Sequence, residues 1–243
     1  MRVWDLDAGY LSRQRLLGEH LEIHGMYVVL SEDRKGYRQH PETVRWEKTL
    51  PAVALRHAQL AAEMAVRGYN HRSPIVLDDY APVWPDTFID TPAAQAALLA
   101  QKYGPDERGR LPLPKNNQQL WAQHKYSVMA RSPARYKDLG PRVAKLRGAP
   151  SDALWQELIE VLREPPALPR TRNAVAHMWG YVSKHVDTAE RALVEQRMER
   201  HLRWVLDRVV ALSQQHGVTY LLESTALGEL SVHLPEAVDG ADD

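Results

Sequence analysis

Hydrophobic and polar residues alternate with a helical period along almost the whole chain, and strand-like alternation is nowhere sustained over more than a few residues. The first such pattern predicts a helix over residues 12–30, with Ser12 in the place of an N-cap. Four of its residues follow the i, i+4, i+7, i+11 spacing of one helix face, the apolar stripe of an amphipathic helix: Leu17, Leu21, His24 and Val28. The sequence therefore predicts an all-α fold.

Prolines and glycines divide the rest of the chain. Pro41 suits the first turn of a second helix, Pro51 must kink or restart that helix, and Gly68 is placed to end it. Residues 71–114 hold seven prolines and predict a surface connector with a short helix over residues 93–103. Four later helices are predicted, at residues 116–131, 135–146, 152–163 and 188–216.

Composition narrows the class of protein. The chain has 243 residues, of which 44% are hydrophobic and 26% charged, and it contains no cysteine. It has neither an apolar run long enough for a membrane span nor the pattern of a signal peptide. We therefore expect a cytoplasmic, nucleoid-associated protein without disulfides and without contact to a membrane.

The overall charge of zero conceals a segregation of charges. Residues 113–150 carry eight Lys or Arg and one acidic residue, Asp138, whereas residues 151–243 carry nine basic and fifteen acidic side chains. A basic stripe in a neutral protein is an electrostatic footprint for nucleic acid. The charges alone equally fit a solvated helix face.

Glu22 shares a predicted helix face with Gly18 and Gly25, so its neighbours above and below lack side chains. Two glycines inside a helix cost on the order of 1 kcal/mol each relative to alanine, which indicates that something approaches the backbone closely. Two interpretations are open: another helix packs tightly against the glycines, or the face is a clearing that presents a carboxylate.

No metal or nucleotide motif accompanies this carboxylate. On a helix Glu22 points about 200° away from His20 and His24, so these three residues cannot share one ion. The sequence has no HExxH, no GxSxG, no GxxxxGK[ST] and no GxGxxG after a strand. We therefore assign none of the histidines to a metal and expect neither a metal nor an organic cofactor.

Four motifs occur together in residues 1–75: MRVWDL, LLGEHLEIHG, KGYRQHPETVRW and AEMAVRGYNHRSP. In this combination the segment resembles the pyrimidine-dimer DNA glycosylase family of endonuclease V-like enzymes. The resemblance implies a compact helical unit in which the N-terminal amino group is the nucleophile and a helix glutamate is the catalytic carboxylate. By position, these roles fall on Met1 and Glu22.

The implied chemistry suits a chain terminus, because near neutral pH more of an α-amine than of a lysine amine is unprotonated. Attack of the Met1 amine at the sugar C1′ expels the damaged base and leaves an imine, which allows β-elimination of the 3′ phosphate. The Glu22 carboxylate would stabilise the developing positive charge and handle protons at the sugar. Since Arg2 is bulky, we expect Met1 to be retained.

The partner implied by the resemblance is double-stranded DNA containing damaged bases. Two DNA-contacting arginines of the family correspond here to Leu21 and Gly25, so phosphate binding must fall to other cations. We assign it to eight residues in both halves of the chain: Arg2, Arg13, Arg15, Lys35, Arg38, Lys125, Arg131 and Arg135.

The second half resembles a different family, on the stretches HKYSVMARSPARYKDLGPRVAKL and NAVAHMWGYVSKHV. These are similar to an uncharacterised helical domain found fused to thiouracil desulfidases and encoded near photolyases, which implies a nucleic-acid-repair setting and a C-terminal helical bundle. The expected organisation is a glycosylase-like domain at 1–90, a Pro-rich connector at 91–114, a helical domain at 115–235 and an acidic tail at 236–243.

Together these observations predict a DNA glycosylase with abasic-site lyase activity on UV-type pyrimidine dimers. One alternative is the same imine chemistry on another lesion, such as a ring-opened purine, or on abasic sites only. The other is a non-catalytic DNA-binding or scaffolding protein that keeps the helices without the activity.

Overall fold

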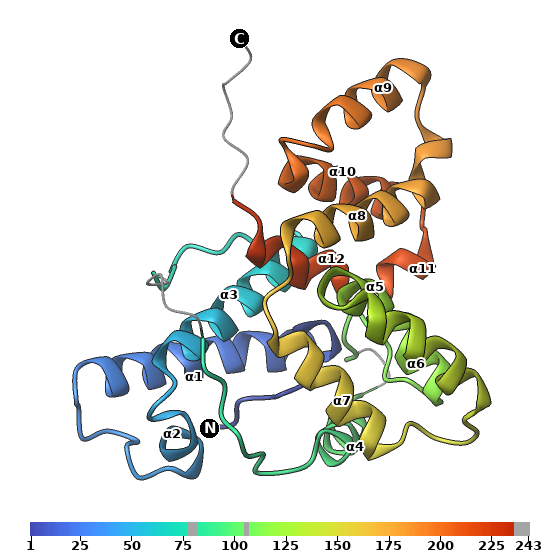
Figure 1. Ribbon diagram of the computed structural model, residues 1–243. Helices are drawn as coiled ribbons and strands as arrows, with labels where there is room; N and C mark the ends of the chain where they lie inside the picture. Colours follow the sequence, from blue (N-terminus) through green and yellow to red (C-terminus); the bar gives the residue numbers. More distant parts are fainter. Residues whose placement is uncertain (77–81, 105–106, 236–243) are drawn as a thin grey trace. The chain divides into compact units, whose positions relative to one another are not determined.

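The computed structural model describes residues 1–76, 82–104 and 107–235, and over these residues it is built from helices without any strand (Figure 1). This confirms the all-α prediction. The chain divides into two compact units, one made of residues 1–114 and 150–159, the other of residues 115–149 and those from 160 onward. Within the described ranges, no helix is both long and apolar enough to cross a membrane.

The first unit contains a short 3-10 helix and four α-helices, and α7 begins in it. Their bounds are η1 Ala8–Tyr10, α1 Arg13–Ser31, α2 Pro41–Trp46, α3 Leu50–Val66, α4 Pro92–Lys102 and α7 Asp152–Arg163. The second unit receives the end of α7 and the remaining described elements. These are α5 Asn117–Arg131, α6 Pro133–Lys145, α8 Leu168–Val182, η2 Ser183–His185, α9 Thr188–Arg197, α10 Leu202–Gln215, α11 Thr219–Leu222, α12 Ala226–Glu229 and η3 Leu230–His233.

Several helix ends lie where the sequence predicts them. The Ser12 side chain accepts a hydrogen bond from the Arg15 N–H at 3.4 Å and so caps α1. Pro51 lies in the first turn of α3, which makes it the start of a new helix after α2. Gly68 follows the last turn of α3 with φ of 74°, a left-handed conformation that favours glycine. These predictions are confirmed.

The predicted apolar face of α1 is wrong. Leu17 and Leu21 are 41% and 72% exposed. The buried face instead contains Leu16, Ile23 and Met26, spaced by seven and three residues. This buried face belongs to the side of α1 that packs in the core, and α3 lies beside α1 (Figure 1).

Two predictions for the second half also change. The run expected as one helix over 188–216 is two helices, α9 and α10, with a break that brings Val194 of α9 and Val205 of α10 into one core. Helix α8 was not predicted, because Pro165, Pro166 and Pro169 crowd its start. Pro169 occupies the first turn of α8, where a proline costs no hydrogen bond.

The segment expected as a surface connector contributes to the core of the first unit. Leu99 of α4 and Leu111 are fully buried. Trp155, from the start of α7, contacts Tyr10 edge to face with ring centroids 5.5 Å apart. The predicted domain limits at residues 90 and 114 remain a prediction, and the acidic tail at 236–243 lies outside the described residues.

The second unit buries an ion pair as well as an apolar core. Its core gathers residues of α5, α8 and α10, among them Ala130, Val175, Met178, Val205 and Val209. Beside it, the Arg131 guanidinium donates to both carboxylate oxygens of Glu229 at 3.0 and 2.8 Å, and its side chain has no exposed surface. Burial acts to raise the pKa of Glu229, but the Arg131 guanidinium, together with His233 and Ser127, lowers it, and the net pKa is lowered.

We expect Arg131→Met to destabilise the protein by about 3–5 kcal/mol, because it leaves the Glu229 carboxylate buried without its cation. The melting temperature of the full chain, followed by circular dichroism, measures this loss. Arg135→Met is the matched control, since the exposed Arg135 lies 3.4 Å from Glu164 and should cost less than about 1 kcal/mol. Equal losses in the two variants would show that the Arg131–Glu229 pair is not buried.

Candidate active site

The first residues of the chain lie against α1 and share Glu22 as a polar partner. The Met1 amino group is 3.6 Å from Glu22 Oε1, and the Arg2 N–H donates a hydrogen bond to Glu22 Oε2 at 2.7 Å. The Glu22 side chain is 37% exposed, whereas that of Met1 is 8% exposed. An amine and a carboxylate thus lie next to each other at the protein surface, where the carboxylate is partly exposed to solvent.

One turn earlier on α1, Glu19 fixes the same N-terminal segment from inside the unit. Its carboxylate accepts the Trp4 N–H at 3.1 Å and two hydrogen bonds from Arg56 of α3, at 2.8 and 3.0 Å. Both side chains are buried. Burial raises the pKa of Glu19, and the Arg56 guanidinium counteracts this shift. The segment is therefore held at two successive turns of α1, once in the interior and once at the surface.

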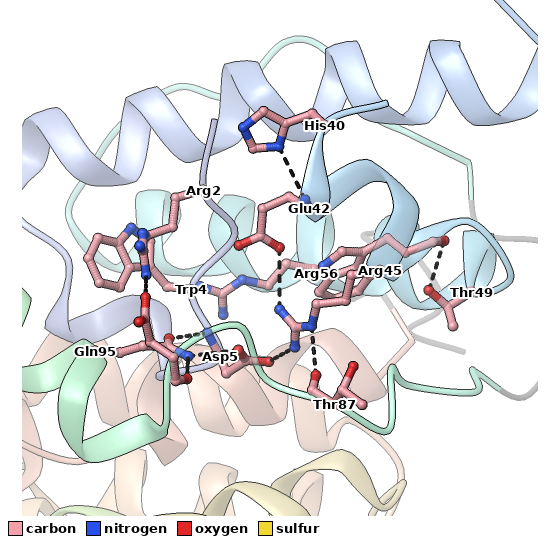
Figure 2. A network of polar contacts seen from close by, with 12 residues as sticks. Arg2, Trp4, Asp5, His40, Glu42, Arg45, Thr49, Arg56, Thr87 and Gln95 are labelled. Atoms are coloured by element: carbon pink, nitrogen blue, oxygen red, sulfur yellow. Dashed lines mark hydrogen bonds and ion pairs between the residues drawn. The ribbon is translucent and has the colours of Figure 1, made fainter. Parts of the chain in front are cut away.

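A second network holds the residues that follow (Figure 2). Arg45 of α2 points toward Asp5, Glu42 and the carbonyl oxygen of Thr87, with contacts of 2.5, 3.3 and 2.7 Å. The Asp5 N–H donates to Gln95 of α4 at 2.8 Å, and the Gln95 amide donates back to the Asp5 carboxylate at 2.8 Å. Three separate parts of the first unit thereby fix the direction in which the N-terminus reaches α1.

The glycine face around Glu22 is open. A Cβ atom built on Gly18 or on Gly25 meets nothing within 4 Å among the described residues outside its own helix turn, and both glycines are exposed. Of the two interpretations drawn from the sequence, tight helix packing fails, and the clearing agrees with the structure. The helix retains two residues of poor helix propensity without an internal packing reason.

Three of the cations predicted to bind DNA lie on accessible parts of the first unit. Arg13 and Arg15 occupy the first turn of α1, where Arg13 is exposed and Arg15 half-buried. Lys35 is exposed in the loop between α1 and α2. Their phosphate contacts remain a prediction.

Two further predicted cations already have acidic partners. Arg2 is 2.5 Å from Asp90, and Arg38 contacts Asp33 as well as Glu47, the latter at 2.8 Å. To contact a phosphate, each arginine would have to leave its carboxylate partner or contact the carboxylate and the phosphate at the same time.

In the second unit, Arg131 requires a correction. Its guanidinium is enclosed by Glu229 and by the carbonyl oxygens of Ser127 and Glu164, so the geometry does not support a phosphate contact at this residue. The predicted contacts of Arg135 and Lys125 remain predictions: Arg135 is exposed, and the Lys125 ammonium lies 4.7 Å from the ring centres of Tyr126 and Tyr220.

On another face of α1, the structure brings four histidines together. His20 and His24 come from α1, His57 from α3, and His71 from the segment after α3. His57 Nε2 is 3.1 Å from the Nε2 atoms of both His20 and His24, and His20 Nε2 is 3.0 Å from that of His71. All four ligand atoms lie within 4.8 Å of one another.

Three of these imidazoles, those of His20, His24 and His57, have pKa values below the usual range of histidine. Burial, with the neighbouring His24 and His71, lowers the pKa of His20 to about 4. Burial and the three other rings lower the pKa of His57 to about 3, and the pKa of His24 is also lowered, mainly by burial. A neutral imidazole has a lone pair available for a hydrogen bond or a metal ion.

Sequence reasoning missed this cluster because it tested His20 and His24 only together with Glu22. The i, i+4 spacing of the two histidines, which places them on one helix face, was the available signal. His57 and His71 carry no local signal, since only the packing of α1 against α3 brings them near.

Comparison with known families agrees with the two resemblances. Residues 1–76 match the family model of pyrimidine dimer DNA glycosylases, and residues 125–229 match a family of proteins of unknown function. No individual curated protein and no solved structure matches the chain. The first match covers less than half of the chain, and for residues 1–76 it favours a DNA repair glycosylase that acts on DNA.

If DNA binds against the open face of α1, adding side chains to this face should raise the stability of the protein but lower its activity. We expect Gly25→Ala and Gly18→Ala each to raise the melting temperature by about 2–4 °C, since alanine gains about 1 kcal/mol in an exposed helix. Release of bases from damaged duplex should nevertheless fall.

Gly180→Ala in α8 is the matched control, because its Cβ also meets nothing within 4 Å. It should raise stability and leave base release unchanged. Full activity in Gly18→Ala and Gly25→Ala would mean that no DNA approaches this face.

Proposed function

We propose that the first unit is a DNA glycosylase with abasic-site lyase activity that acts on UV-type pyrimidine dimers in double-stranded DNA. The observation that carries this proposal is the Met1 amino group 3.6 Å from the Glu22 carboxylate, beside the open face of α1. The match of residues 1–76 to the pyrimidine dimer DNA glycosylase family supports the same reaction class.

The reaction begins with the unprotonated Met1 amine. Its lone pair forms a bond to the sugar C1′, the glycosidic bond breaks, and the base leaves with the bonding electrons and takes up a proton. Loss of the amine proton and opening of the sugar ring give a protonated imine between Met1 and C1′. Removal of a C2′ proton then breaks the C3′–O bond and expels the 3′ phosphate. Water hydrolyses the imine and restores the amine.

Glu22 has two tasks in this sequence. Its negative charge lies next to the nitrogen that becomes cationic, so it stabilises each positively charged species without reorganisation. It is also within reach of protons on the amine and the sugar, as a general acid or base must be. The hydrogen bond from the Arg2 N–H holds the carboxylate in place.

The anchoring of the N-terminal segment provides the positioning that this mechanism needs. Holding an amine and a carboxylate in a fixed mutual geometry contributes to the rate by removing the entropy cost of bringing them together. Here the fixing groups are Glu19 at Trp4 and Arg45 at Asp5. Arg15 lies seven residues before Glu22 and so on the same face of α1, where its charge would attract the phosphate backbone.

Borohydride should trap the protein covalently on a duplex that contains an abasic site, because it reduces the imine to a stable amine. The protein should carry its tag at the C-terminus, and mass spectrometry should verify that Met1 is the first residue. Extending the N-terminus by two uncleaved residues should abolish trapping, while the same extension at the C-terminus leaves it unchanged. Trapping that persists in the N-terminally extended protein would show that a lysine is the nucleophile, and this result would contradict the proposal.

For Glu22→Gln we expect base release from UV-irradiated duplex to fall about 10²–10³-fold, the usual loss when a preorganised electrostatic group is removed at the reacting centre. The amide oxygen can still accept the Arg2 N–H, so DNA binding should change only a few fold. Glu32→Gln, an exposed carboxylate at the end of α1, is the control and should retain full activity. Unchanged turnover in Glu22→Gln would leave Glu22 with a structural role alone. Cleavage of abasic duplex without cleavage of irradiated duplex would restrict the substrate to abasic sites.

A further inference from the structure

The four-histidine cluster of His20, His24, His57 and His71 is not explained by the proposed reaction. Glu22 points to another side of α1, and neither the Met1 amine nor the clearing involves these rings. The cluster also does not form a stacked aromatic core, because the ring planes of His20 and His71 meet at 88° and those of His24 and His57 at 80°. Instead, each of the four rings brings a ligand nitrogen within 4.8 Å of the others.

Hydrogen bonds among the rings cannot account for this convergence. Each ring nitrogen has a single in-plane site, which either carries a proton or offers a lone pair. The Nε2 of His57 has two short contacts, to His20 and His24, and the Nε2 of His20 also has two, to His57 and His71. At least one of these contacts therefore brings together two nitrogens that share no hydrogen bond and repel each other. A cation bound between the four nitrogens removes this repulsion, because each nitrogen can then direct its lone pair at the cation.

We propose that His20, His24, His57 and His71 bind one divalent transition-metal ion, with zinc as the best-fitting occupant. Zinc prefers four ligands in a tetrahedron with Zn–N distances of 2.0–2.1 Å, which places the nitrogens about 3.3 Å apart. Three Nε2 separations are 3.0–3.1 Å, and all four ligand atoms lie within 4.8 Å of one another, so the more distant rings need to move by up to about 1.5 Å to complete the tetrahedron. Imidazole ligands suit zinc better than magnesium or calcium, which prefer oxygen.

Four protein ligands complete the coordination shell of zinc, which makes this a structural site. The ion would join three parts of the first unit: α1, α3 and the segment that follows α3. That segment carries Tyr69, His71 and Arg72, which line a pocket of about 320 Å³ together with Arg13 and His20 of α1. The metal thus fixes the wall of a basic pocket and, since its ligands are neutral, adds two positive charges close to it.

The metal content of the full-length protein tests this proposal directly. The protein should be purified with a tag that contains no histidine and without chelators, and its metals measured by mass spectrometry. We expect one zinc ion per chain. Removing it with a chelator should lower the melting temperature, and adding Zn²⁺ should restore it, because a ligand that binds only the folded state stabilises that state. Cobalt substitution should give the intense visible absorption of a tetrahedral four-nitrogen site.

His71→Gln is the most informative variant, since His71 lies outside the helices and is only half-buried, so the variant should fold. We expect its zinc affinity to fall at least about 100-fold, as losses of even indirect ligand contacts cost 10–100-fold. The matched control is His185→Gln, which alters the other close histidine pair, His185 and His216, with rings 4.2 Å apart in the second unit. It should keep one zinc ion and the cobalt spectrum.

Any of three results would overturn the proposal. The first is wild-type protein that contains no metal and takes up none in a Zn²⁺ titration. The second is equal zinc binding by wild type and His71→Gln, and the third is loss of zinc in His185→Gln; either of these two would place the ion elsewhere. None of these measurements depends on glycosylase activity, so the metal site and the proposed function can fail independently.

Discussion

The salt bridge between Glu19 and Arg56 is the interaction on which the first unit depends. It joins α1 to α3 with two charge-assisted hydrogen bonds in a buried position, where an unpaired charge would cost several kcal/mol. The same carboxylate accepts the Trp4 N–H, so the pair that connects the two helices also fixes the N-terminal segment. The position of the Met1 amine relative to Glu22 is thus a consequence of an ion pair one helical turn away.

Helix α1 has three faces, and each of them lies in a different environment. Leu16, Ile23 and Met26 face the core, His20 and His24 face the histidine cluster, and Glu22 lies with two glycines at the surface. At 100° per residue, such faces are fixed relative to each other by the helix itself. A helix with one apolar face and one solvated face could not place all three groups in their different environments. The apolar, histidine and glycine positions are therefore interspersed along α1 because its three faces contact different surroundings.

Local rules predicted most helix boundaries, because Ser12, Pro51 and Gly68 act within one turn of their own positions. The proximity of Met1 and Glu22 came from family resemblance, since no local rule brings residue 1 to residue 22. Two features escaped prediction because they depend on packing across distant sequence. Arg131 looks like a surface cation in its basic segment, yet Glu229 holds it in the interior. The histidine cluster requires α3 and the following segment to meet α1, which no spacing reveals.

The position of Trp155 bears on how the chain folds while it is being made. Its indole ring packs on Tyr10 in the core of the first unit, although it belongs to α7. As the chain leaves the ribosome, residues 1–76 emerge long before residues 150–159, and all of α5 and α6 are synthesised in between. The core around the segment that matches the glycosylase family is therefore incomplete until residues 150–159 have been synthesised. A nascent chain that stops before residue 150 exposes the apolar surface that Trp155 later covers.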